Sequence, residues 1–231
     1  MLNVLCLKYG DKYSPEYVNK LHNMVQRHLT VPHRFICFTE DRTGIDPEIE
    51  IFPLPLINDI KGWWWKTYLF KADHFPAGQT NLFFDLDIVL VNNIDNLLDF
   101  MPGHFVGLQD PNKIFQRPIK LNSSVMRWQS GHYGDLWTAI ESDRRSIHGL
   151  HGDQDWIWKQ YHSQIKFFPA TWIKSYKWEV RNHNELVRLG TQQRFATVRN
   201  PELDPETSIL VFHGTPNPAD VQDQIIVDNW R

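Results

Sequence analysis

The sequence predicts an α/β fold in which helices flank one mixed, mostly parallel sheet. Three observations predict it. Strand-like apolar runs alternate with helical patterns through the first half of the chain, and two aspartates interrupt one of these runs. The length of 231 residues suits one domain with a substantial core. Because ligands of such sheets bind beyond the carboxyl ends of the strands, we expect a single domain with its site along that edge.

The first half of the chain provides the alternation of strands and helices. Ser14 and Pro15 are typical of a helix N-terminus, and apolar residues at helical spacing continue that helix to Leu29. The expected strands are Asn3–Leu7, Arg34–Phe38, a short one around Glu50–Phe52 and a long one over Asn81–Val91, with a second helix over Trp64–Ala72. The first two loops at the carboxyl edge are then Tyr9–Tyr13 and Thr39–Asp41.

The second half is less regular. It contains an expected strand over Lys120–Met126, a helix over Gly134–Ser142 and a strand over Ser208–Phe212 that ends in His213. A further helix opens at Gly152, with Asp153 or Asp155 in its first turn. The pattern shows no internal repeat and no linker.

Composition excludes several classes of protein. The net charge is −3 and no block of basic residues stands out, which argues against nucleic acid or an anionic membrane as the main partner. No stretch approaches the ~20 apolar residues that span a bilayer, and the N-terminus lacks a basic leader. We expect a cytoplasmic protein, and in that reducing compartment Cys6 and Cys37, which lie in apolar runs, are expected to be buried free thiols.

Asp85 and Asp87 are the most informative residues. In an extended strand, two side chains that are separated by one intervening residue point to the same face. Two like charges at the end of a buried strand are costly unless a positive charge lies between them. A divalent cation would meet that need and could also hold a diphosphate.

Six short segments follow one another along the chain: Tyr9–Tyr13, Trp63–Lys66, Asp85–Asp87, Asn122–Val125, Gly152–Asp155 and His213–Pro218. Taken in this order, they resemble the motifs of the glycogenin-like (family 8) glycosyltransferases, and most closely those of a set of small bacterial members. The resemblance runs nearly the full length of the chain. It implies a GT-A fold, with a nucleotide-binding half over about 1–91 and a donor-sugar and acceptor half over about 92–231.

The resemblance also implies a chemistry. Members commonly use UDP-sugars and Mn²⁺ and retain the anomeric configuration; Mg²⁺ is the alternative ion. The implied metal ligands are Asp85, Asp87 and His213, and two carboxylates with an imidazole suit Mn²⁺. A metal together with Lys66 would stabilise the nucleoside diphosphate as it leaves.

Other residues receive roles by the same resemblance. Tyr9, Asp11 and Tyr13 match the segment that holds the nucleoside. Asn122 and Ser123 match contacts to the donor sugar, and Gly214 with Asn217 matches the loop at the diphosphate. Asp153, Gln154 and Asp155 match the catalytic segment that faces the anomeric carbon, where a carboxylate acts either as a nucleophile or only as a stabiliser of the transition state. The simpler alternative, that one aspartate caps the helix, stays open.

Asn217 is a departure, because relatives carry lysine there. A charge-assisted contact to phosphate is therefore lost or weakened, although another cation such as Lys177 could replace it.

Alternative functions stay open as well. Phe84–Leu90 also looks like the first motif of haloacid-dehalogenase-type phosphatases, although Ile88 and Val89 replace its usual Gly-Thr. A nucleotide-sugar-binding protein without turnover is the other alternative. The acceptor is unknown, whether glycan, lipid-linked sugar or protein. Trp63, Trp64, Trp65 and Trp172 either line an acceptor groove or pack in the core.

Overall fold

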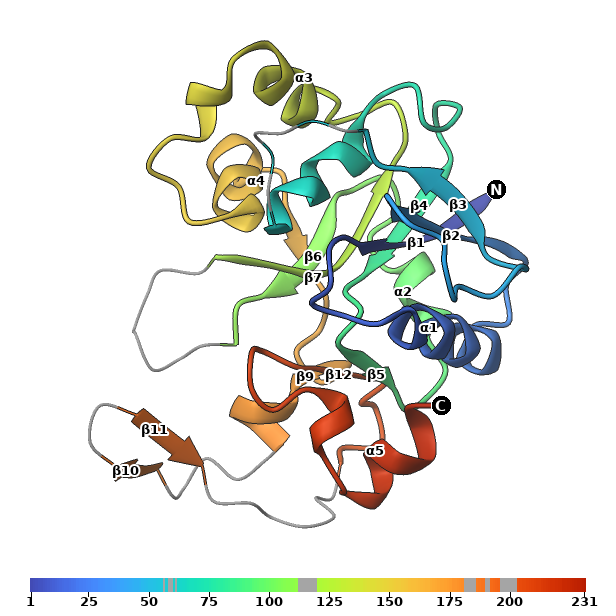
Figure 1. Ribbon diagram of the computed structural model, residues 1–231, viewed down its shortest axis with the longest axis vertical. Coiled ribbons are helices and arrows are strands. Elements are labelled where there is room, and N and C mark those ends of the chain that lie inside the picture. Colours follow the sequence, from blue (N-terminus) through green and yellow to red (C-terminus); the bar gives the residue numbers. More distant parts are fainter. Residues whose placement is uncertain are drawn as a thin grey trace.

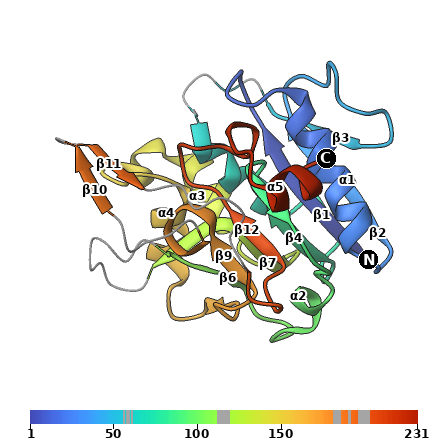
Figure 2. The same cartoon turned by 90° about the horizontal axis from the view of Figure 1, so that it is seen from below.

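The structure, a computed structural model, describes residues 1–231 apart from 56, 58, 59, 61, 112–119, 181–185, 190, 191 and 196–202. For β10 (Leu186–Leu189) and β11 (Gln192–Phe195) it describes the backbone alone. These two strands form a hairpin that projects from the rest of the molecule in both views (Figures 1 and 2).

A seven-stranded sheet with the order β3-β2-β1-β4-β7-β6-β8 forms the centre of the molecule (Figure 1). Its pairs are parallel except where β7 meets β4 and β6, so the prediction of a mixed, mostly parallel sheet is confirmed. The strands are β1 (Leu2–Lys8), β2 (His33–Thr39), β3 (Glu50–Pro53), β4 (Thr80–Phe84), β6 (Val106–Gln109), β7 (Leu121–Gln129) and β8 (Lys166–Phe167).

Helices cover both faces of this sheet, and β1 shows why. Its residues alternate, so that Val4 and Cys6 contribute to one hydrophobic core while Leu5 and Leu7 contribute to the other. The first core includes helix α1 (Pro15–His28), and the second includes α3 (Asp135–Ser142), α4 (Asp153–Tyr161) and the 3₁₀ helix η1 (Gly62–Phe70). The shorter helical elements are α2 (Asn96–Asp99), η3 (Arg144–Ile147), η4 (Tyr176–Val180), η5 (Pro218–Asp220) and α5 (Gln224–Asn229).

A second sheet of three strands adjoins the large one. Its order is β5-β12-β9, with bounds Ile88–Leu90, Ile209–Val211 and Ile173–Ser175. Helix α5 contacts strand β5 of this small sheet (Figures 1 and 2). All these elements form a single domain.

The expected long strand over Asn81–Val91 is wrong, because the chain changes sheets within it. β4 ends at Phe84 in the large sheet, and β5 begins at Ile88 in the small one. Asp85, Leu86 and Asp87 form the turn between them. The side chain of Leu86 is buried in the first core. The alternation of inward and outward side chains therefore continues through the turn, although the strand pairing does not.

The expected second helix over Trp64–Ala72 is wrong in its type and bounds, because η1 is a 3₁₀ helix over Gly62–Phe70. The hydroxyl of Thr67 donates to the carbonyl of Trp64, three residues earlier, at 2.7 Å. Bulky aromatic residues favour an α-helix only weakly, and 3₁₀ geometry places side chains three residues apart on one face. Trp63 and Lys66 thereby share a face.

The remaining expected elements over described residues are confirmed, within a few residues at their ends. No helix among the described residues is both long and apolar enough to cross a membrane.

Candidate active site

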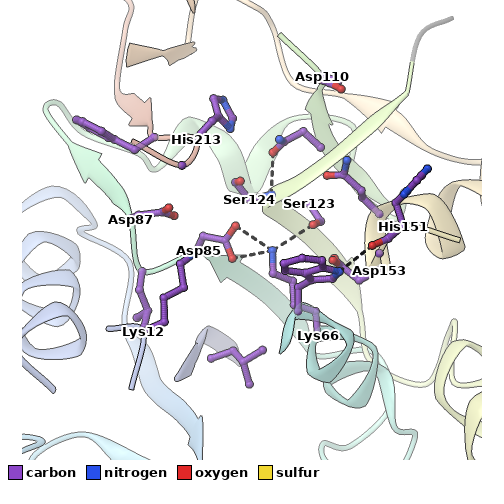
Figure 3. A pocket seen from close by; sticks show the side chains of 18 of the residues that line it. Lys12, Lys66, Asp85, Asp87, Asp110, Ser123, Ser124, His151, Asp153 and His213 are labelled. Carbon is purple, nitrogen blue, oxygen red and sulfur yellow. Dashed lines mark hydrogen bonds and ion pairs between the residues drawn. The ribbon is translucent and has the colours of Figure 1, made fainter. Parts of the chain in front are cut away.

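A cleft of about 470 Å³ opens beyond the carboxyl ends of β1 and β4, a size typical of ligand sites. Loops after β1, β6 and β12, the turn after β4, the start of β7, and the starts of η1 and α4 supply its walls. Figure 3 shows Asp85 and Asp87 on one side of this cleft, His151 and Asp153 on the other, and the ammonium group of Lys66 between them. The edge predicted from the sequence is therefore where the cleft lies.

Two backbone hydrogen bonds hold the aspartate turn to both sheets. The N–H of Asp85 donates to the carbonyl of Ser124 in β7 at 2.9 Å, and the N–H of Phe212 donates to the carbonyl of Asp87 at 3.2 Å. With Leu86 buried between them, both carboxylates face the cleft. The turn is thus fixed by segments that lie far apart in the sequence.

Lys66 provides the positive charge beside Asp85. Its Nζ lies 2.7 Å from Oδ1 and 2.9 Å from Oδ2 of Asp85, and 3.1 Å from the hydroxyl of Ser123. Burial alone would lower the pKa of Lys66, but the nearby charges of Asp85 and Asp153 outweigh it and raise the pKa above its usual value. Lys66 therefore stays protonated in the cleft.

Asp87 is the less well compensated carboxylate. It is only 7 % exposed, and its Oδ2 accepts a hydrogen bond from the hydroxyl of Tyr13 at 2.7 Å. Burial, and after it the charge of Asp85, raises the pKa of Asp87 to about 6. Burial and the charge of Asp87 raise the pKa of Tyr13 as well, so the phenol remains a donor.

Two buried polar atoms at the cleft find no hydrogen-bond partner within the described residues, Oδ2 of Asp153 and Nε2 of His213. Burial raises the pKa of Asp153 and lowers the pKa of His213 to about 4. The imidazole is therefore neutral at physiological pH, the state in which it binds a metal ion. A buried atom without a partner costs stability unless a ligand satisfies it.

The donor set for a metal ion fits in chemistry but is not assembled in advance. Asp85, Asp87 and His213 all line the cleft, and the neutral imidazole has a ring nitrogen to offer. Across the described ranges, however, no three His, Cys, Asp or Glu side chains converge closely enough to hold an ion. Lys66 instead occupies both oxygens of Asp85.

Comparison with solved structures identifies the architecture. The galactosyltransferase LgtC, in complex with donor and acceptor sugar analogues, superposes with a TM-score of 0.63 over 94 % of this chain and 88 % of LgtC, at 13 % identity. An active-site mutant of LgtC superposes with a TM-score of 0.63 over 96 % of this chain and 91 % of its own, at 11 % identity. The chain has the GT-A fold.

A second glycosyltransferase shares this fold in part. GlyE of Streptococcus pneumoniae superposes with a TM-score of 0.54 at 12 % identity, over 75 % of this chain and 47 % of the GlyE chain. No protein-family model and no curated protein matches the sequence. The similarity thus concerns the GT-A fold rather than close sequence kinship.

Within the GT-A fold, the cleft brings together the predicted site residues except Asp11 and Asn217. Asp11 is exposed outside the cleft lining. Asn217 begins the turn η5, where its N–H donates to Asp220 at 2.8 Å. The residues in the lining are Tyr9, Tyr13, Lys66, Asp85, Asp87, Asn122, Ser123, Asp153, Gln154, Asp155, His213 and Gly214. Their roles toward a ligand stay predictions.

The sequence interpretation missed other lining residues, among them Lys12, Asp110, His151 and Trp178. Lys12 lies inside a motif that was already singled out, and its charge acts on Asp87. Asp110 directly follows β6, so its place at a strand end was a usable signal. Trp178 belongs to the irregular element η4, and nothing in the local pattern marks it.

Proposed function

We propose that this protein is a metal-dependent glycosyltransferase that moves a sugar from a UDP-sugar to an acceptor with retention of configuration. One observation carries the proposal: a GT-A fold in which Lys66, Asp85, Asp87 and His213 line one cleft. The other lining residues give each part of the donor a partner.

The diphosphate binds between Lys66 and the aspartate turn. Lys66 moves from Asp85 to a phosphate oxygen and stabilises the charge that develops as the diphosphate leaves. Asp85, Asp87 and His213 would hold Mn²⁺ or Mg²⁺, which would supply further positive charge to the diphosphate. The positive charge would also offset the repulsion between the two carboxylates.

The nucleoside binds in the first half of the chain, residues 1–91. An aromatic ring at Tyr9 or Tyr13 stacks on the base, and Asp11 contacts the base or ribose. The hydrogen bond from Tyr13 to Asp87 orients the tyrosine, so this bond links the site for the base to the site for the diphosphate. The loop after β12, with Gly214 and Asn217, covers the diphosphate on the side away from Tyr13.

The donor sugar binds in the second half, residues 92–231. Asn122, Ser123 and Oδ2 of Asp153, an atom without a hydrogen-bond partner among the described residues, form hydrogen bonds with its hydroxyls. Asp153, Gln154 and Asp155 lie in the first turn of α4 and face the anomeric carbon. Retention follows by one of two routes. In the first, a carboxylate of this turn displaces the diphosphate from the anomeric carbon, and the acceptor hydroxyl then displaces that carboxylate. In the second, the acceptor attacks on the face that the diphosphate leaves.

Calorimetric titration of UDP tests the first step. UDP should bind at least tenfold more tightly with Mn²⁺ than with a chelator, and Asp87→Asn should lose that difference. Asp41→Asn, an exposed aspartate outside the cleft lining, is the matched control and should keep it. An affinity that does not change on adding chelator contradicts the metal assignment.

A panel of UDP- and GDP-sugars tests turnover without knowledge of the acceptor, because slow donor hydrolysis releases the nucleotide. Tight UDP binding with no release from any donor would make the protein a binding protein instead. Release of phosphate from a generic phosphoester would favour a phosphatase. We also place the protein in the cytoplasm, on the buried free thiols of Cys6 and Cys37.

A further inference from the structure

Trp63 is an exposed indole in an otherwise polar part of the cleft. It is 51 % exposed, whereas Trp65 is 7 % exposed and belongs to the core. Among the described residues it is the only Trp, Tyr or Phe side chain in the exposed range. Trp64 and Trp172 pack against the two cores instead. Of the four tryptophans that the sequence offered for an acceptor groove, Trp63 alone lines the cleft.

The indole of Trp63 is held in one orientation. Its Nε1 donates to the carbonyl of His151 at 3.0 Å. A Cβ added to Gly152 would lie 2.6 Å from Nε1 and 2.8 Å from Cδ1 of the indole, so only glycine lets the ring edge lie against the start of α4. The side chain has therefore lost its rotamer freedom before any ligand arrives, which lowers the cost of binding.

Polar groups stand at the same rim. Asp155 pairs with Lys120 at 3.3 Å through Oδ1, and its Oδ2 lies 3.4 Å from the N–H of His151. The carboxylate keeps further lone pairs for hydroxyl donors, and Gln154 lines the same wall. A rigid indole beside carboxylate and amide groups suits a ligand that has one apolar face and a ring of hydroxyls.

We propose that Trp63 is the floor of the acceptor subsite and that the acceptor presents a pyranose ring, so that it is a saccharide rather than a protein side chain. The assignment rests on the proposed function. The acceptor ring lies on the indole, and Gln154 and Asp155 take its hydroxyl groups.

The layout of the cleft assigns this ring to the acceptor rather than to the donor. Lys66 lies three residues after Trp63 on the same face of η1 but is only 8 % exposed, so the charged groups lie deep and the indole lies at the mouth. Figure 3 shows His151 and Asp153 across the cleft from Lys12 and Asp87. The base, held at the loop after β1, is therefore on the opposite side.

Saturation-transfer NMR with simple sugars tests the subsite directly. The probes are methyl glycosides of glucose, galactose and mannose, with the open-chain polyol sorbitol as a control ligand. Trp63→Ala should weaken binding of the best glycoside about tenfold, which is ~1.4 kcal/mol. Gly152→Ala should weaken binding to the same extent, because the new methyl group displaces the indole without removing it. The backbone of Gly152 is extended, a conformation that alanine also adopts. Trp230→Ala, a tryptophan outside the cleft lining, should bind like the wild type.

UDP titration of the same variants distinguishes an indole that binds the acceptor from an indole that binds the base of the donor. UDP affinity within twofold of the wild type in Trp63→Ala supports an acceptor floor, whereas a tenfold loss shows that the indole holds the base and overturns the proposal. Binding of sorbitol as well as the glycosides, equal glycoside binding by Trp63→Ala, or no glycoside binding by the wild type overturns it too. If the wild type binds no UDP but its glycoside binding needs Trp63, the saccharide site at Trp63 stands, whereas the proposed transferase function and the acceptor role that rests on it fail.

Discussion

Asp87→Asn should make the folded protein more stable at neutral pH, although it removes a candidate metal ligand. The folded-state pKa of about 6 lies above the ordinary value near 3.9. Between these values the folded state binds more protons than the unfolded state, so the free energy of unfolding falls as the pH rises. Two pKa units correspond to about 3 kcal/mol at 1.36 kcal/mol per unit. Asparagine escapes this loss and still accepts the hydrogen bond from Tyr13.

Urea unfolding of wild type and variant, in a chelator and at steps from pH 4 to pH 8, measures the effect. The difference in unfolding free energy should grow from near zero at pH 4 to about 3 kcal/mol in favour of the variant above pH 6. Asp73→Asn is the control, because Lys71 holds the pKa of the exposed Asp73 below its usual value and its removal should bring no gain. A difference that stays flat with pH would refute the raised pKa of Asp87, and with it the argument that burial and the charge of Asp85 disfavour the ionised carboxylate.

Four further substitutions test the cleft. Lys66→Met should lower the unfolding free energy by about 3 kcal/mol at pH 7, and by less at pH 4, because it leaves Asp85 unpaired; equal stability in urea would contradict this. Tyr13→Phe should raise the pKa of Asp87 further and lower the free energy of unfolding by about 1.5 kcal/mol above pH 6. NMR titration measures the pKa and urea unfolding the stability, and an unchanged pKa would show that Tyr13 does not form a hydrogen bond with Asp87. His213→Ala should abolish donor turnover yet cost only about 1 kcal/mol, since Nε2 has no partner within the described residues; normal turnover would remove it from the metal shell. Asn217→Lys should tighten UDP binding about tenfold at low salt and less at high salt; equal affinities at low salt in calorimetry would show that the loop does not face the diphosphate.

Much of the fold follows from local patterns in the sequence. Residues 2–8 alternate between two apolar faces, and the helix that begins after Ser14 ends close to the predicted position. Since strand–helix alternation makes parallel pairs, it also predicts the edge at which loops gather. That rule is why the predicted Tyr9 and Asp85 meet in one cleft despite their distance in the sequence. Asn122 joins them for another reason, because β7 runs antiparallel to β4 and its first residues therefore lie at the same edge.

The sequence could not reveal where the chain changes sheets. An apolar run has the same sequence pattern whether it pairs within one sheet or is divided between two. The change of sheet depends on pairing between β5 and β12, and β12 lies more than a hundred residues later in the sequence. Local propensity likewise does not distinguish a 3₁₀ helix from an α-helix over Gly62–Phe70. In the 3₁₀ form Trp63 and Lys66, three residues apart, lie directly in line along one face.

The partner of Asp85 is the main point on which structure changes the interpretation. The sequence argument required a positive charge beside the two aspartates and assigned it to a metal. The structure supplies Lys66 instead, which neutralises Asp85 and leaves Asp87 with its raised pKa. The charges of Lys12 and Lys66 also act on Asp87 but do not offset its burial.

This imbalance is itself an argument for a ligand. A cost of about 3 kcal/mol is a large share of the 5–15 kcal/mol that typically separates folded from unfolded states. Leu86 anchors the turn in the core and two backbone hydrogen bonds hold it to both sheets, so the packing does not require the carboxylate of either aspartate. A cation that binds only the folded state would recover the loss. Mn²⁺ added without nucleotide should therefore raise the unfolding midpoint of the wild type but not of Asp87→Asn, and equal shifts in both proteins would show that the ion binds elsewhere.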